Sequence, residues 1–491
     1  MTLRELAAHV PGAVVAGDAS VPVTAVTHDS RKAGPGALFV AIRGTSIDGN
    51  RFVEAARKKG AAAVASEEAP HPGGPWVRVP DAREALATLA AEVLGRPADA
   101  LRLVGVTGTN GKTTTTYLID AALRAAGHKT GLLGTVQYRV GDRQADASRT
   151  TPESSDLQAL FREMVDAGCS HAVLEVSSHS LDLKRVHGCA FQVAVFTNLT
   201  RDHLDFHGDM DRYFLAKRRL FDTYLRTDGH ALINLDDDRA AELIAASRGR
   251  VWTYSVNGGP ADLQASDIRL SLDATRFRVR TPAGDFEVRT PLLGRFNVEN
   301  VVAALGAALA LGLDPQTALR GISSVAGVPG RLERVLAGQD FTVIVDYAHT
   351  DDALKNLLET VRELRPRRLI TVFGCGGDRD RTKRPLMAAV AARLSDVVVV
   401  TSDNPRSEPP EAILEEIQRG MNGGRRAERH AIVDRREAIV RALEMAGSGD
   451  AVVIAGKGHE TYQVLRDRTV PFDDRQVARD VLTRLARSGK A

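Results

Sequence analysis

Cysteine is scarce in this chain of 491 residues. Only Cys169, Cys189 and Cys375 are present, scattered and odd in number. A disulfide framework needs paired cysteines, and a structural zinc site needs ligands a few residues apart. The sequence therefore argues against a disulfide-stapled secreted domain, and we expect a protein of a reducing compartment, the cytoplasm.

Long apolar runs are also missing. The longest nearly apolar stretch, 301–313, is too short to span a bilayer and is typical of a buried helix. The opening string MTLRELAAHV carries Glu5 and no apolar core, so we expect no signal peptide. The formal net charge of +3 is small for this length, which indicates neither a nucleic-acid nor a membrane surface but leaves anionic small substrates open.

Strand-like apolar runs alternate with helical patterns over most of the chain. Examples are LRLVGVTG before TTTTYLIDAALRAAG, and the runs HAVLEVSS, VAVFTNL, RLITVFG and DVVVVTS. This alternation predicts an α/β protein with mostly parallel sheets. The segment 275–294 differs, because apolar residues at every second position flank Pro-Ala-Gly-Asp, and this pattern predicts an antiparallel hairpin.

The length is too great for one hydrophobic core and favours three domains. Gly95 and Pro97 stand before the first strong strand, and the string GVPG separates a later helical segment from a new strand. We therefore predict a smaller N-terminal α/β domain over 1–97, a central α/β domain with a mostly parallel sheet over 98–328 and a C-terminal Rossmann-like α/β domain over 329–491.

The strongest local signal is the glycine-rich string VGVTGTNGKTTTTYLI, in which a strand leads through a turn into a helix starting near Lys112. Glycines let backbone N–H groups face a triphosphate, and the helix N-terminus adds partial positive charge. Val106 stands where the standard Walker pattern has its first glycine, so the prediction depends on GTNGKTT. The predicted ATP contacts in the loop are Gly108, Thr109, Asn110, Gly111, Lys112, Thr113 and Thr114.

A phosphate loop alone fits a switch GTPase, a motor ATPase, a kinase or a ligase. Further strings follow in order along nearly the whole chain: RTTP, EVSSHSLDLKRV, TNLTRDHLDFHG, YFLAKRRLF, GRFNVENVVAA, PGRLERV, DYAHT, GCGGDRDRTKRP, SDNPRSE and GKGHE. In these strings the chain resembles the Mur ligases. The resemblance implies a monomeric, ATP- and Mg²⁺-dependent amide ligase with separate domains for a UDP-linked substrate, ATP and an amino acid, and without nucleic-acid or membrane partners.

The resemblance also implies a metal site beside the phosphate loop. Glu175 ends the strand-like run HAVLEV and is a natural Mg²⁺ ligand together with Thr113. His203 matches the family's second metal-site histidine, although by itself it is more typical of a core or loop histidine. Lys217 matches a lysine that the family carries as a carbamate (N6-carboxylysine), although its sequence neighbours suggest a surface lysine. The predicted catalytic residues are Lys112, Glu175, His203 and Lys217.

Further substrate contacts follow from the resemblance. Those for the remainder of ATP are Asn297, Asn300, Arg331, Asp346 and His349. Those for UDP-N-acetylmuramoyl-L-alanyl-D-glutamate are Ser30, Thr45, Ser46, Ile47, Thr150, Thr151, Ser177 and Arg185. Two positions depart from the family pattern, since Asp351 replaces the proline of DYAHTP and Leu183 replaces a glutamine.

The segment SDNPRSEPP after the run DVVVVT bears on the choice of amino acid. By itself it is typical of a turn, because Asp, Asn and Pro are common turn formers. Mur ligases that add meso-diaminopimelate carry Asp-Asn-Pro-Arg here, whereas those that add L-lysine lack the arginine. Diaminopimelate is lysine with an extra distal carboxylate, which a guanidinium binds through paired hydrogen bonds. The predicted contacts are Arg379, Asp403, Asn404, Pro405, Arg406, Gly456 and Glu460.

Two alternatives stay open at this point. A folylpolyglutamate synthetase would share the phosphate loop but lack the UDP-binding domain and the Asp-Asn-Pro-Arg segment. A P-loop switch or regulatory ATP-binding protein would lack ligase chemistry. The sequence favours the ligase that adds meso-diaminopimelate through an acyl phosphate, since an unactivated carboxylate does not acylate an amine at neutral pH.

Overall fold

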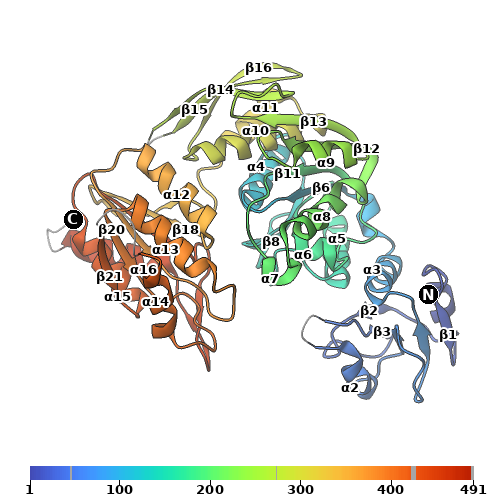
Figure 1. The fold of residues 1–491 in the computed structure, drawn as a ribbon. Helices are drawn as coiled ribbons and strands as arrows, with labels where there is room; N and C mark the ends of the chain where they lie inside the picture. The colour runs from blue at the N-terminus through green and yellow to red at the C-terminus, as the bar shows by residue number, and fades with distance from the viewer. Residues whose placement is uncertain (45–46, 272–273, 422–426, 488–491) are drawn as a thin grey trace.

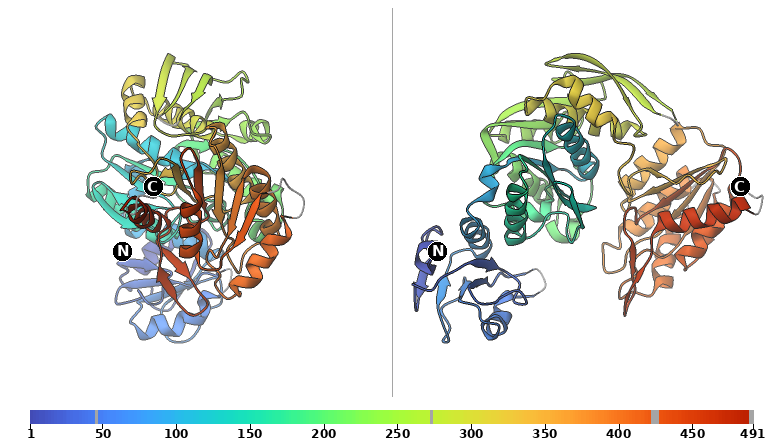
Figure 2. Two further views of the ribbon diagram at one scale, coloured as in Figure 1. Left: turned by 90° about the vertical axis from the view of Figure 1, so that its left-hand side faces the viewer. Right: turned by 180° about the vertical axis from the view of Figure 1, so that it is seen from behind.

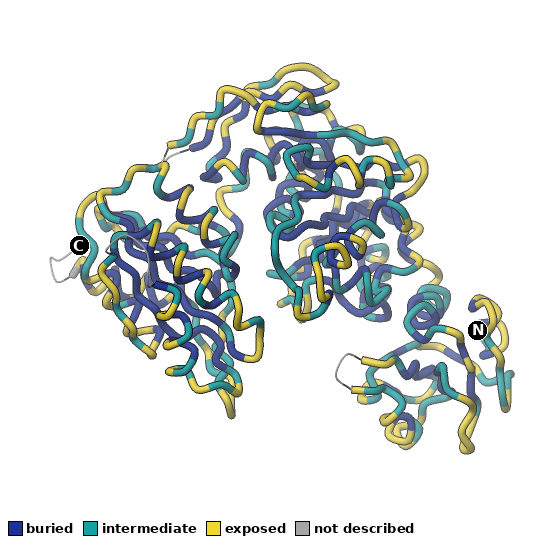
Figure 3. Tube along the Cα trace, viewed as in Figure 1, coloured by how far each residue is buried: buried dark blue, intermediate teal, exposed yellow. Residues whose placement is uncertain are grey.

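The computed structural model describes residues 1–44, 47–271, 274–421 and 427–487. The chain forms three α/β domains, which follow one another from blue through green to red, and the two outer domains lie on separate sides of the central one (Figures 1 and 2). Buried residues follow the strands at the centre of each domain (Figure 3). The predicted α/β class is confirmed. In the described part of the chain, no helix is long and apolar enough to cross a membrane.

The N-terminal domain is a five-stranded sheet with helices on both faces. The strand order is β1-β5-β4-β3-β2, and only β1 runs antiparallel to its neighbour. Leu86 of α3 packs with Val77 on one face, and Ala56 of α2 packs with Trp76 on the other. The bounds are α1 Leu3–Ala7, β1 Val14–Ala16, β2 Ala25–Thr27, β3 Ala37–Val40, η1 Gly49–Phe52, α2 Val53–Lys58, β4 Ala63–Ser66, β5 Trp76–Arg78, α3 Ala82–Val93 and η2 Pro97–Ala100.

The central domain is an eleven-stranded sheet in the order β16-β15-β14-β13-β12-β11-β6-β10-β7-β8-β9. Its middle strands are parallel, and the edge strands are antiparallel. The predicted hairpin is confirmed as β15 and β16, which pair from Thr275 with Thr290 to Thr281 with Gly284. The predicted buried helix is α10, whose apolar residues pack in one core with those of α4, α11 and the sheet.

The bounds in this domain, in chain order, are β6 Arg102–Thr107, α4 Lys112–Ala125, β7 Thr130–Leu133, β8 Gln137–Val140, β9 Arg143–Asp146, α5 Ser154–Asp166, β10 His171–Glu175, α6 Ser178–Asp182, β11 Phe191–Phe196, α7 Leu204–His207, α8 Met210–Asp222, β12 Leu225–Asn234, α9 Ala240–Ala246, β13 Arg250–Ser255, β14 Leu263–Leu270, β15 Thr275–Thr281, β16 Gly284–Thr290, α10 Arg295–Ala310 and α11 Pro315–Ser323.

The C-terminal domain is a doubly wound sheet in the order β17-β18-β22-β19-β20-β21. Helices α12, α13 and α14 cover one face, and α15 and α16 cover the other, so its strands are apolar on both sides. The carboxyl ends of parallel strands meet at one edge, where doubly wound sheets bind their ligands. The bounds are β17 Glu333–Arg334, β18 Thr342–Asp346, α12 Asp351–Glu363, β19 Leu369–Phe373, α13 Lys383–Leu394, β20 Val397–Val400, α14 Pro410–Arg419, β21 Glu428–Ala431, α15 Arg435–Met445, β22 Ala451–Ala455, β23 Tyr462–Val464, β24 Thr469–Pro471 and α16 Asp474–Arg487.

A buried ion pair between α15 and α16 lies next to the carboxyl end of β22. Arg435 on α15 and Asp474 on α16 are both fully buried, and the guanidinium donates to the carboxylate at 2.8 and 2.7 Å. Arg435 also donates to the carbonyl of Ala455 at the end of β22, at 2.9 Å. The pair therefore ties two helices to the sheet.

Arg435→Met should lower the free energy of unfolding by about 3–5 kcal/mol, because it leaves the Asp474 carboxylate buried without its cation. Urea unfolding of the full chain measures this loss. The exposed pair of Arg226 and Asp228 supplies the control, and Arg226→Met should cost no more than about 1 kcal/mol. Equal losses in the two variants would show that burial of the ion pair is unimportant.

Candidate active site

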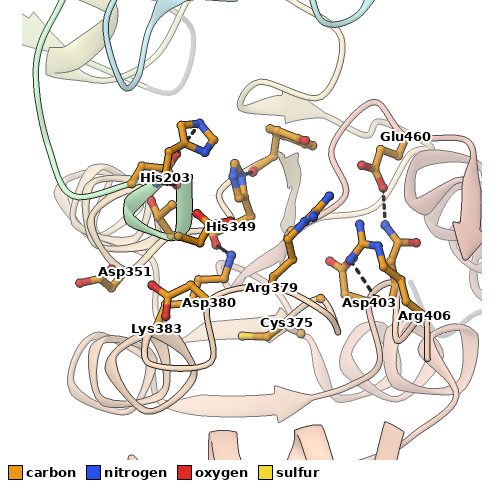
Figure 4. A pocket seen from close by; sticks show the side chains of 18 of the residues that line it. His203, His349, Asp351, Cys375, Arg379, Asp380, Lys383, Asp403, Arg406 and Glu460 are labelled. Atoms are coloured by element: carbon orange, nitrogen blue, oxygen red, sulfur yellow. Dashed lines mark hydrogen bonds and ion pairs between the residues drawn. The ribbon is translucent and has the colours of Figure 1, made fainter. Parts of the chain in front are cut away.

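A cavity of about 450 Å³ lies between the central and C-terminal domains. The central domain lines it with His179 and the segment 201–205, and the C-terminal domain lines it with the loops that follow β18, β19, β20 and β22 (Figure 4). Its lining carries both cationic side chains, among them Arg379, Lys383 and Arg406, and anionic ones, among them Asp380, Asp403 and Glu460. The cavity therefore suits a small zwitterion that carries both carboxylates and ammonium groups.

The predicted phosphate loop has the expected strand-turn-helix form, with β6 ending at Thr107 and α4 beginning at Lys112. Gly108 and Gly111 have positive φ angles of 150° and 85°. A Cβ at Gly108 would lie 1.8 Å from Thr197 Oγ1, and one at Gly111 would lie 2.4 Å from Asn300 Oδ1. Only glycine fits at these two positions.

Two lysine ammonium groups meet at this loop. Lys112 Nζ donates to the carbonyl oxygens of Gly108 and Thr109 at 2.9 and 2.8 Å, and Lys217 Nζ donates to the same Gly108 oxygen at 2.7 Å. Lys217 is 1% exposed, so the surface-lysine alternative is wrong. Burial, and then the charge of Lys112, lower the pKa of Lys217 well below its ordinary value. Burial also lowers the pKa of Lys112, against the opposing charge of Glu175.

Glu175 lies at the end of β10, beside the phosphate loop, and is 1% exposed. Its two oxygens accept hydrogen bonds from the Thr135 backbone N–H at 2.8 Å and the Thr135 hydroxyl at 3.0 Å. Thr113, the other predicted oxygen ligand, is also buried. Hydroxyl and carboxylate oxygens are the donors that Mg²⁺ prefers, so these residues fit that ion.

His203 lines the cavity and has a left-handed backbone, with φ of 54°. Burial lowers the pKa of its imidazole, and the neighbouring Asp202 carboxylate opposes this shift. Across the described residues, no three His, Cys, Asp or Glu side chains form a ready metal cluster. Mg²⁺ commonly takes one or two protein oxygens and completes its shell with water and substrate phosphates.

Three predicted ATP contacts come from the C-terminal domain. Arg331 reaches across to the phosphate loop, where its Nη2 donates to Thr113 Oγ1 at 3.2 Å. Asp346 accepts the backbone N–H groups of Leu332 and Ala348 at 2.6 and 2.7 Å, so its carboxylate shapes its own loop. His349 lines the cavity. The structure therefore brings Arg331 to the phosphate loop and uses Asp346 to hold the adjoining turn.

The two asparagines predicted for the adenine side lie beside the phosphate loop on α10. Asn300 Oδ1 accepts the Thr115 hydroxyl at 3.2 Å, and Asn300 Nδ2 donates to Asn297 Oδ1 at 3.0 Å. Asn297 Nδ2 donates to the carbonyl of Leu293 at 2.7 Å. Both side chains are buried, and these amides brace the loop against α10.

The presence of Asp351, where the family pattern has proline, leaves the start of α12 regular. Asp351 is the first residue of α12, and the hydroxyl of Thr350 caps the helix by accepting the Ala353 N–H at 3.2 Å. Both proline and an acidic residue suit the first turn of a helix. The replacement therefore does not alter the helix start. Leu183 lies at the C-terminal end of α6 and is half-buried.

Residues predicted for the UDP-linked substrate fall into two groups. One group lies in the central domain and consists of Thr150, Thr151, Ser177 and Arg185. The Thr150 and Thr135 hydroxyls are hydrogen-bonded at 3.0 Å, and the Thr151 hydroxyl donates to the Glu175 carbonyl at 2.8 Å. Thr151 also donates to Ser177 at 3.4 Å, and Arg185 donates to the Thr151 carbonyl at 3.2 Å. Ser30 and Ile47 belong to the N-terminal domain, where Ile47 is exposed. Thr45 and Ser46 lie outside the described residues.

The loop after β20 is built around Asn404, which is 4% exposed. Its Oδ1 accepts Lys457 Nζ at 3.1 Å and the Val464 N–H at 2.9 Å, and its Nδ2 donates to Glu460 Oε2 at 2.9 Å. Lys457, absent from the predicted site, is fully buried and donates to the same Glu460 oxygen at 2.8 Å. Its position within GKGHE was the available signal. Asn404 therefore acts first as a support for Glu460.

Arg406 lines the cavity near Glu460 and Arg379 (Figure 4). Its backbone is left-handed, with φ of 53°, and its N–H donates to the Val464 carbonyl at 3.1 Å. Its Nη1 donates to the Gly377 carbonyl at 2.8 Å.

The rest of this predicted group surrounds Arg406. Pro405 precedes it and is buried, and Arg379 is exposed at the cavity wall. Gly456 lies against Asp403, since a Cβ there would stand 2.6 Å from Asp403 Oδ2. The predicted amino-acid contacts thus gather at one end of the cavity.

Comparison with known proteins identifies the family. Residues 22–93, 106–308 and 330–458 match, in that order, the Mur ligase family catalytic domain, the Mur ligase middle domain and the Mur ligase glutamate ligase domain. A UDP-N-acetylmuramoyl-L-alanyl-D-glutamate--2,6-diaminopimelate ligase of Solibacter usitatus is 50% identical over 470 residues, 94% of each chain. This chain belongs to the Mur ligase family.

Solved structures agree with this Mur ligase assignment. The structure of a UDP-N-acetylmuramoyl-L-alanyl-D-glutamate--2,6-diaminopimelate ligase is 37% identical, with 99% of each chain covered and a TM-score of 0.70. A folylpolyglutamate synthase of Mycobacterium tuberculosis, complexed with ADP and AMPPCP, shares the fold at 20% identity and a TM-score of 0.61. That comparison covers 75% of this chain and 91% of the synthase.

In this Mur ligase, Asn404→Ala should lower the free energy of unfolding by about 1–3 kcal/mol without any ligand, because Lys457 Nζ and the Val464 N–H lose their acceptor. Thermal unfolding of the free protein measures the change. Arg379→Ala, at the exposed wall of the same cavity, is the control and should stay within about 0.5 kcal/mol. An unchanged free protein that loses only substrate binding would mean that Asn404 serves the substrate alone.

Proposed function

We propose that this Mur ligase uses ATP to join meso-diaminopimelate to UDP-N-acetylmuramoyl-L-alanyl-D-glutamate, in the synthesis of peptidoglycan precursors. One observation carries the proposal: the Arg406 guanidinium and the Glu460 carboxylate lie at one end of a cavity that opens toward the phosphate-loop domain. A distal carboxylate needs a cation and a distal ammonium needs an anion, and meso-diaminopimelate carries both groups.

The reaction divides into two steps. The terminal carboxylate of the UDP-linked substrate attacks the γ-phosphorus of ATP, the bond to the bridging oxygen of ADP breaks, and an acyl phosphate forms. The neutral amine of diaminopimelate then attacks the acyl carbonyl, inorganic phosphate leaves with the C–O bonding electrons, and the amine loses a proton. Anionic groups crowd together in the first step, so the cations of Lys112 and Arg331 stabilise it.

The chain's own residues position the reactants. Thr150, Thr151, Ser177 and Arg185 would hold the muramoyl peptide beside Glu175, and the N-terminal domain would hold the UDP group through Ser30, Thr45, Ser46 and Ile47. Asn297 and Asn300, with Asp346 and His349, would flank the base and ribose of ATP. Thr113, Glu175, His203 and the Lys217 carbamate would hold Mg²⁺, which neutralises phosphate charge when bound.

Neither alternative function accounts for the whole chain. A folylpolyglutamate synthetase leaves the N-terminal domain without a role, and a P-loop switch leaves the cavity between the domains unexplained. A monomer in the cytoplasm agrees with the proposal, since the three cysteines are unpaired and buried and ATP is a cytoplasmic substrate.

Lys217 is suited to carbamylation because its neutral amine can attack CO₂, which forms an N–C bond and releases one proton. An ordinary lysine, with a pKa of about 10.4, is almost wholly charged at pH 7. Burial and the neighbouring ammonium of Lys112 favour the neutral amine here. The product is an anion at the position where Lys217 now faces Lys112, so the modification replaces a repulsion with an attraction.

Protein equilibrated with ¹³C-bicarbonate should show a carbamate carbon signal that Lys217→Met abolishes and that Lys129→Met, at an exposed lysine, retains. The signal should be strong above the lowered pKa of Lys217 and fade as the pH falls through it, because protonation removes the nucleophile.

Lys217→Ala should be nearly inactive and regain activity with short carboxylic acids. Full activity without rescue would show that no carbamate is needed.

The wild-type protein should release ADP with meso-diaminopimelate and largely reject L-lysine. Arg406→Ala should lower kcat/KM for diaminopimelate by about thirty- to thousandfold, the equivalent of about 2–4 kcal/mol, while lysine use holds steady or rises slightly. Steady-state kinetics with both amines, at saturating ATP and UDP-linked substrate, measure the effect. Arg419→Ala, exposed on α14, is the control. An equal fall for both amines would assign Arg406 to folding or domain closure.

A further inference from the structure

Two loops build the amino-acid end of the cavity: 374–380 after β19 and 401–408 after β20. They are bonded to each other, since the Gly377 N–H donates to the Asn404 carbonyl at 3.0 Å and Arg406 Nη1 donates to the Gly377 carbonyl at 2.8 Å. A Cβ at Gly377 would stand 1.9 Å from the Pro405 carbonyl. The direction of the Arg406 side chain therefore depends on where the first loop lies.

A single buried guanidinium holds both loops from behind. Arg384 on α13 is fully buried and binds the Glu408 carboxylate through both ends, Nη2 to Oε1 at 2.8 Å and Nη1 to Oε2 at 3.0 Å. Its Nη2 also donates to the Gly376 carbonyl at 3.3 Å, and its Nη1 donates to Glu416 on α14 at 2.7 Å. Glu408 Oε1 further accepts the Asp378 N–H at 2.7 Å. One ion pair thus fixes the spacing of the two loops.

We propose that Arg384 and Glu408 are positioning residues for amino-acid selection, because they hold the two loops at the spacing that aims Arg406 at the distal carboxylate. Neither side chain lines the cavity. The backbone of Arg406 is left-handed, which is costly for a residue with a side chain and persists only where neighbours hold it. A guanidinium fork also binds a carboxylate well only over a narrow range of angles. This inference rests on the proposed function.

Glu408→Gln tests the proposal, because the amide keeps the size of the side chain but loses the charge and one acceptor for Arg384. We expect the KM for meso-diaminopimelate to rise by about tenfold, while kcat and the KM values for ATP and the UDP-linked substrate stay within about twofold. In an Arg406→Ala background, the same substitution should add less than about a twofold change, since there is no longer a side chain to aim.

Glu416→Gln is the matched control. It removes a charge from the same Arg384 guanidinium but leaves Glu408 on the loop, so it should lower Tm without raising the KM for diaminopimelate. Asp378→Gly is a second variant for the case in which Glu408→Gln does not fold. Asp378 is exposed, and its carboxylate accepts the Ser407 N–H at 3.2 Å and the Ser407 hydroxyl at 2.6 Å. Its φ of 53° is one that glycine adopts without strain. Asp378→Gly should therefore also raise the KM for meso-diaminopimelate.

Four results would overturn the proposal: an unchanged KM for diaminopimelate in Glu408→Gln, equal rises in KM for all substrates, full additivity with Arg406→Ala, or the same kinetic change in Glu408→Gln and Glu416→Gln. Each would assign Arg384 and Glu408 to stability alone. The wild-type enzyme is assayed first with meso-diaminopimelate. If the wild-type enzyme releases no ADP with that amine, the proposed function fails. If the wild-type enzyme reacts but Glu408→Gln keeps the wild-type KM, only the positioning role of Arg384 and Glu408 fails.

Discussion

Two lysine side chains donate to one carbonyl oxygen in the phosphate loop, and the repulsion between their positive charges is the main electrostatic constraint on the site. Lys112 and Lys217 both donate to the oxygen of Gly108, where Lys217 is buried and Lys112 is half-buried. Two like charges in such a place repel each other strongly, so the site favours either a neutral Lys217 or an added anion. A carbamate on Lys217 or a bound phosphate group would each add negative charge and relieve part of this repulsion, so the phosphate loop is suited to an anionic ligand.

The second constraint is the division of the site between two domains. The central domain holds the phosphate loop and Glu175, whereas the C-terminal domain holds Arg406 and Glu460 at the carboxyl edge of its own sheet. Arg331 joins the two by bonding Thr113. Under the proposed function, the central domain activates the carboxylate, the C-terminal domain selects the amine, and the two reactants meet in the cavity between them.

Much could be predicted from local pattern. The phosphate loop, the parallel strands and the hairpin of β15 and β16 follow from glycine spacing and from the period of apolar residues, which depend on neighbours in the chain. The family resemblance added the order of the domains and the candidates for each substrate. The resemblance also implied that the segment around Arg406 contacts the amino acid, and a guanidinium suits the distal carboxylate of diaminopimelate.

The sequence by itself determined which groups are available, and only the tertiary structure decided their state. Lys217 has a helical, arginine-rich context typical of a surface residue, yet packing of α8 against the loop buries it and lowers its pKa. Asn404 and Lys457 are 53 residues apart, and their contact fixes Glu460. Burial and long-range hydrogen bonds arise when distant segments pack together, so no local pattern contains them.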